Sequence, residues 1–182
     1  MACSIANGRV EQCKDSVSGL RNIYFINYQI EPSHVTYDVT NTDLITAVTN
    51  VDSLYKFELK STENSFEQTI NSDRNNGTTF FTQTLNIKLK KQDIATSKSI
   101  KLLSYGRPHV VIQTNSNQFF LMGLNHGADV TAGALSSGSD MASFNGYSLT
   151  LEAQEECYAN FLNAATESAM VTLFTSATLV VG

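Results

Sequence analysis

Charged side chains are scarce in this chain of 182 residues: they make up 16% of it, against a usual figure of about 25%. Twelve Lys and Arg residues stand against seventeen Asp and Glu residues, which gives a formal net charge of −5. The densest basic stretch is only Lys88 to Lys91. Because tight nucleic-acid binding needs a basic face that neutralises phosphates, the sequence argues against a protein that holds DNA or RNA.

Cysteine and proline are also rare. Cys3, Cys13 and Cys157 are odd in number and form no CxxC pair, which argues against a disulfide framework and a zinc site. We expect reduced and largely buried thiols, and a Cys3–Cys13 pair stays open if Asn7 and Gly8 form a hairpin turn. The two prolines and ten glycines exclude a fibrous or low-complexity protein, and the length suits a single domain over residues 1–182.

Long apolar runs are missing as well. Residues 1–8 have neither the basic nor the apolar region of a signal peptide. The longest apolar stretch, residues 169–181, is interrupted by four Thr and Ser residues and is too short to span a bilayer. We therefore expect a protein without membrane contact that is synthesised in a cytoplasm.

Alternation of apolar and polar residues predicts strands along most of the chain. The predicted strands cover residues 23–28, 53–60, 66–70, about 78–90, 109–114, 118–123, 130–134 and 146–154, with short segments at 158–162 and 170–181. Such a pattern is typical of a mainly β protein, folded as a sandwich or barrel. We expect one core to contain the apolar residues Phe57, Phe81, Leu85, Leu149 and Leu151.

Three segments break the alternation. Residues 91–104 suit one inserted α-helix of about three turns, which Gly106 and Pro108 end. Residues 31–52 are rich in Thr, Asn, Asp and Ser, which predicts a long polar loop or an arm that orders against a partner. Asn7-Gly8 is a turn signal, so residues 3–13 are expected to form an N-terminal hairpin.

No motif for catalysis, cofactor binding or metal binding stands out. The segment 133–138 lacks the spacing of a nucleophilic serine elbow, and His34, His109 and His126 form no metal-binding pattern. We interpret His109 as a core or edge residue and Asp129 as the cap of a tight turn beside His126. Glu152, Glu155 and Glu156 are interpreted as a solvated strand end. We therefore predict that the protein is not an enzyme and uses no cofactor.

The predicted outer faces carry more Thr, Ser, Asn and Gln than charge. Together with exposed β edges and the polar segment 31–52, this composition favours a subunit that assembles with copies of itself.

The order of elements resembles the tail tube proteins of tailed bacteriophages. The resemblance lies in two strands, a long strand, the helix at 91–104, the hairpin HVVIQTNSNQFFLMG and the segment GADVTAGALSSGSDMASFNGYSLTLEAQEE. The opening, ACSIANGRVEQCKDSVSGLRNIYFINY, is similar to structural proteins of phages from Bacteroidetes hosts. The resemblance covers about 150 residues as a pattern, without a single specific motif.

The resemblance implies a virion protein of the tail whose rings, usually hexameric, stack into a tube that conducts DNA. Its partners would be its own copies and other tail or head-tail connector proteins, with DNA only as passing cargo. We expect a polar, neutral to negative lumen lined by the non-core residues Thr82, Thr84, Asn86, Ser148, Thr150 and Glu152. Alternatives left open are a short-tail ring or hub protein, a capsid decoration or adhesin-like module, and a small hydrolase.

Overall fold

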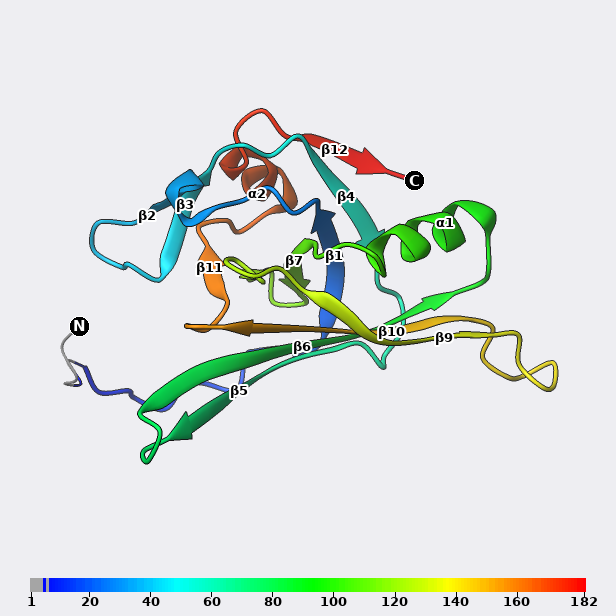
Figure 1. Cartoon of the computed structure of the whole chain (residues 1–182), viewed down its shortest axis with the longest axis horizontal. Coiled ribbons are helices and arrows are strands. Elements are labelled where there is room, and N and C mark those ends of the chain that lie inside the picture. The colour runs from blue at the N-terminus through cyan, green and yellow to red at the C-terminus, as the bar shows by residue number, and fades with distance from the viewer. Residues whose placement is uncertain (1–4, 6) are drawn as a thin grey trace.

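Two stacked β-sheets form the framework of the molecule. The computed structural model describes residue 5 and residues 7–182, and this part of the chain forms one sheet of eight strands, one of four strands and two α-helices (Figure 1). The mainly β prediction is confirmed. Within the described residues neither sheet closes into a barrel, so the sandwich describes the fold and the barrel does not.

The eight-stranded sheet is covered on both faces. In spatial order its strands are β12 (Thr178–Val181), β4 (Ser53–Glu58), β1 (Leu20–Ile26), β7 (His109–Thr114), β8 (Phe119–Met122), β11 (Asn160–Leu162), β3 (Leu44–Val48) and β2 (Val35–Tyr37). In β1, Ile23 and Phe25 belong to the core shared with the smaller sheet, whereas Tyr24 and Ile26 belong to a second core. This double burial explains why β1 is apolar at successive positions.

The smaller sheet is antiparallel and has the order β5 (Ser65–Asp73), β6 (Thr78–Lys90), β10 (Gly146–Glu155) and β9 (Asp129–Ser136). Leu85, Leu149 and Leu151 on its inner face are buried, and Phe57 of β4 packs against them, as predicted. Phe81 departs from the prediction because its ring packs on Tyr158, with centroids 4.4 Å apart, outside this core.

Two helices flank the sheets in the described part of the chain. The predicted helix is α1 (Ile94–Leu103), which begins where the Asp93 carboxylate accepts a hydrogen bond from the Thr96 N–H at 2.8 Å. The second helix, α2 (Glu167–Leu173), was not predicted, and the expectation of one helix is wrong. Its residue Met170 and the following Phe174 fill the second core, so tertiary packing decides this segment rather than local propensity.

The expectation of a polar loop or arm at residues 31–52 is also wrong. The segment forms a 3₁₀ helix, η1 (Pro32–His34), and the strands β2 and β3, and Ile45 and Val48 are fully buried. These two residues are three positions apart, which in a regular strand would place them on opposite faces. A shift of register between β2 and β3 beside Tyr37 brings both into one core, and it hides the alternation that the sequence would otherwise show.

The N-terminal segment differs from its prediction too. Residues 7–19 contain no strand, so the described part of the chain does not form the expected hairpin. Cys3 lies outside the described residues, and so does the possible Cys3–Cys13 pair. Cys13 and Cys157 are exposed rather than buried.

Candidate functional site

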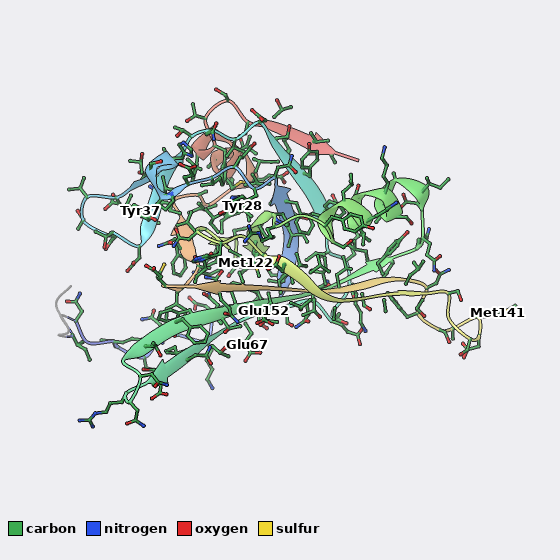
Figure 2. The ribbon with its side chains drawn as sticks, viewed as in Figure 1. Tyr28, Tyr37, Glu67, Met122, Met141 and Glu152 are labelled. Carbon is green, nitrogen blue, oxygen red and sulfur yellow. The ribbon has the colours of Figure 1, made fainter. Side chains whose placement is uncertain are left out.

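The outer face of the four-stranded sheet, which points away from the eight-stranded sheet, is the candidate site. In Figure 2 this sheet lies along the lower side of the molecule, with Glu67 and Glu152 labelled beside it. The register pairs Ser148 with Lys88, Thr150 with Asn86 and Glu152 with Thr84. Because side chains alternate along a strand, these residues share one face, and so does Thr82 opposite Gln154. All six residues expected to line a lumen therefore lie together.

Hydrogen bonds between neighbouring strands hold the polar side chains of this outer face. Thr150 Oγ1 donates to Asn86 Oδ1 at 2.8 Å, and Asn86 Nδ2 donates to Ser65 Oγ at 3.3 Å. Nearer the β5–β6 turn, Asn71 Nδ2 donates to Thr82 Oγ1 at 2.8 Å. These neutral groups form a ladder across the strands that orders their side chains and leaves a surface of hydroxyls and amides.

Acidic and basic side chains lie at different positions along the strands of the outer face. Glu67 and Glu152 both lie opposite Thr84, one on each side, and Asp129 lies opposite Glu152 on β9. Lys88 forms a salt bridge with Glu63 further along β6. Lys90 lies on the same face two residues beyond Lys88, and among the described residues no carboxylate forms a salt bridge with it. The face therefore offers phosphate groups a row of carboxylates and, at the far end of β6, two lysines of which one is paired.

The edges of this sheet are open. Within the described residues β5 and β9 each pair on one side only, and they are nine and eight residues long. By contrast, the edge strands of the larger sheet, β2 and β12, have three and four residues. Proteins usually protect edges with lysine, proline, bulges or short strands. β9 has one bulge at Thr131 but neither Lys nor Pro, and its exposed part runs Ala132-Gly133-Ala134-Leu135.

Glu155 is the residue whose role the sequence did not reveal. Its side chain was expected in solvent, yet Glu155 is only 3% exposed. Glu155 Oε1 accepts the Asn125 N–H at 3.0 Å and the His126 N–H at 2.9 Å, so Glu155 rather than Asp129 caps this turn. Gly127 closes the turn at φ +74°, where a Cβ atom would lie 2.6 Å from the Arg107 carbonyl oxygen. These contacts indicate a structural role.

The histidines do not assemble into a reactive site. His109 is fully buried, as interpreted from its strand, and its Nε2 accepts the Ile30 N–H at 3.2 Å. This bond requires a neutral ring whose Nδ1 donates to the Gly123 carbonyl at 2.6 Å. Burial lowers the pKa of His109, and the carbonyl opposes this effect only in part. The His109 ring also stacks on the Tyr28 ring, with centroids 5.0 Å apart. These contacts indicate a structural role for His109.

Across residue 5 and residues 7–182, no three His, Cys, Asp or Glu side chains group as metal ligands. In the same residues no helix is long and apolar enough to cross a membrane. No protein-family model, curated protein or solved structure matches this chain.

Proposed function

We propose that this protein is a virion structural subunit, a tail tube protein of tailed bacteriophages, whose copies close into rings that stack into a DNA-conducting tube. The observation that carries the proposal is the four-stranded sheet, which has one whole face and both long edges free in the described part of the chain. Joining β5 of one copy to β9 of the next would satisfy the free backbone groups of both edges. Six copies, the number that the resemblance implies, would close the ring.

Exposed apolar residues on both edges support this joining. Ile70 of β5 is 57% exposed, and Leu135 of β9 is 61% exposed. Large aliphatic side chains on long edge strands favour association with another strand, because burying them removes apolar surface from water.

The outer face has the chemistry of a channel wall. DNA that slides past must not meet strong attraction, since each neutralised phosphate adds a salt-dependent contact. Hydroxyl and amide groups offer weak contacts, and the carboxylates of Glu67, Glu152 and Asp129 repel phosphate. A lumen formed by this face would be polar and negative, and the protein needs no catalytic group to conduct DNA.

Electron microscopy and native mass spectrometry of the purified protein test the proposal. We expect rings or tubes for the wild type, and isolated subunits for Leu135→Lys and Ile70→Lys, because a charged edge disfavours strand addition. Val39→Lys is the matched control, since Val39 is 99% exposed in the loop between β2 and β3 and should not alter the rings. A wild-type protein that stays a monomer or a trimer without a lumen would refute the proposal and favour a capsid decoration or adhesin-like module.

A further inference from the structure

The loop between β9 and β10, residues 137–145, holds an apolar side chain out in solvent. Met141 lies at its tip and is fully exposed, and Figure 2 shows it at one end of the molecule. Asp140 precedes it and is the sole charged residue between Asp129 and Glu152. Because methionine adapts to irregular apolar surfaces, a tip that joins it to one carboxylate is suited to contact another molecule.

Hydrogen bonds within the loop hold this tip in place. Asp140 Oδ1 accepts the Ala142 N–H at 2.8 Å, and the Asp140 carbonyl oxygen accepts the Ser143 N–H at 3.2 Å. The bond from Ala142 lowers the pKa of Asp140, so its carboxylate is charged at neutral pH. At the base of the loop, the Asn145 carbonyl oxygen accepts the Lys91 N–H at 2.9 Å. A loop that is ordered in advance loses little conformational entropy when it docks.

A hollow of about 590 Å³ lies where β6 ends. We call it the lysine hollow, and its lining includes Lys56, Lys60, Lys88, Lys90, Lys91, Glu58, Val180 and Val181. Three of these lysines form salt bridges with carboxylates of their own chain. Lys90 and Lys91 are exposed, and within the described part of the chain no carboxylate forms a salt bridge with either. The two valines of β12 are exposed as well, so the hollow combines unpaired positive charge with open apolar surface.

Strand order would bring the loop and the lysine hollow together in a ring joined through β5 and β9. Successive strands of the smaller sheet are antiparallel, so the end of β9 would meet the beginning of β5 in the next copy. Ser136, the last residue of β9, is level with Gly146 and Lys90. β5 begins at Ser65 opposite Asn86, four residues or about 13 Å before Lys90. Joined level for level, the loop that follows β9 would lie beside the end of the neighbour's β6 that β5 does not pair with.

We propose that the loop of residues 137–145 docks into the lysine hollow of the neighbouring copy in the ring. Asp140 pairs with Lys90 and Lys91 there, and Met141 packs on the two valines of β12. This inference rests on the proposed function and names the residues of its lateral contact. Because loop and hollow are different surfaces, the contact is heterologous, and repeating it from copy to copy closes a ring.

The contact supplies a register that the joined strands lack. The exposed part of β9 runs Ala132-Gly133-Ala134-Leu135, and strands of glycine and small residues specify their pairing register weakly. A loop held in one hollow permits one register, because each residue of slip would move its tip by about 3.3 Å. With one register, every copy meets its neighbour at the same angle, which closure of a ring requires.

A double variant of the loop tests the contact from one side. Asp140→Asn with Met141→Ser removes the charge and the apolar side chain, while the asparagine oxygen can still accept the Ala142 N–H. We expect native mass spectrometry to show association between copies weakened about ten-fold or more. Circular dichroism and the urea midpoint should stay those of the wild type, because both residues are exposed.

A second double variant tests the hollow. Lys90→Glu with Lys91→Glu should cause the same loss, because Asp140 of the neighbour then meets charge of its own sign. Lys98→Glu with Lys101→Glu is the matched control with an equal change of charge. These α1 residues do not line the lysine hollow, and the control should associate like the wild type.

A disulfide locates the contact directly. In a chain whose native cysteines are replaced by serine, Met141→Cys with Val181→Cys should give a ladder of cross-linked copies in a denaturing gel after mild oxidation. Met141→Cys with Val39→Cys should stay monomeric in the same gel. Association at the wild-type level in either test variant, or the absence of the ladder, would overturn the inference, while rings leave the proposed function standing. A wild-type protein without rings or tubes would overturn both.

Discussion

Replacing Ile45 by alanine should lower the free energy of unfolding by about 2–5 kcal/mol. Ile45 of β3 is 0% exposed and lies in the core that also contains Val48, Phe119 and Met170. Truncation removes buried apolar surface and leaves a cavity that this packed core fills only in part. For a chain of this size, each kcal/mol shifts the midpoint of thermal unfolding by about 2–4 °C, so a loss of about 3 kcal/mol corresponds to roughly 6–12 °C.

Urea unfolding followed by circular dichroism measures the effect, with the denaturant dependence expected to stay unchanged. Val39→Ala is the control in the same segment, because Val39 is almost fully exposed and should change stability by no more than about 0.5 kcal/mol. A loss below about 0.5 kcal/mol for Ile45→Ala would mean that residues 31–52 do not belong to the core. The polar arm suggested by their composition would then be the better description.

Further expectations concern Glu155, His109 and DNA. Glu155→Ala should cost about 2–4 kcal/mol in urea unfolding, because it leaves two backbone N–H groups without their acceptor, whereas Glu155→Gln keeps one oxygen and should cost less. Burial lowers the pKa of His109, so the unfolded chain binds the proton more readily. Stability should therefore fall as the pH drops below about 6.5, and His109→Gln should reduce this slope. Fluorescence anisotropy with short duplex DNA at about 50 mM salt should detect no micromolar binding; such binding, weakening steeply with salt, would contradict a conduit.

Alternation of apolar and polar residues predicted the strands that are long enough to show this alternation in their own sequence. β6 and β10 are long, have one buried and one exposed face, and therefore show a period of two over many residues. The hairpin of β7 and β8 was also predicted, since the turn at residues 115–117 connects strands that pair with each other. In these cases the information needed to fold the element lies within the element or beside it.

The missed elements depend on partners far away in the sequence. β3 was not predicted, and it pairs in parallel with β11, which lies in the expected segment 158–162, so segments more than a hundred residues apart meet in one sheet. The unpredicted strands β2 and β3 have three and five residues, too few to show alternation, and in β3 the shifted register removes it. The role of Glu155 was hidden for the same reason, because the turn that it caps lies about thirty residues earlier in the chain.

The six residues expected to line a lumen were predicted to lie on non-core faces, and they share one face of the four-stranded sheet. The pairing of β6 with β10 does not show which molecule contacts that face. The pair of carboxylates across β9 and β10 was less accessible still. Asp129 becomes the neighbour of Glu152 only through the register of β9, which its bulge at Thr131 shifts by one residue. A sequence pattern that treats each strand separately cannot find such a pair.

The composition of the outer face needs an explanation beyond stability. Its side chains bury nothing in either core, so packing does not select them. Threonine is a good strand former, which accounts for Thr82, Thr84 and Thr150, but asparagine is a poor one, and Asn71 and Asn86 lie on the same face. A face selected only for solubility would carry interspersed lysine and glutamate, which tolerate water at least as well. The proposed DNA-conducting wall would favour neutral amides and hydroxyls, which satisfy one another across the strands, and its lysines, Lys88 and Lys90, lie at one end of β6. That requirement accounts for the asparagines, which neither strand propensity nor solubility does.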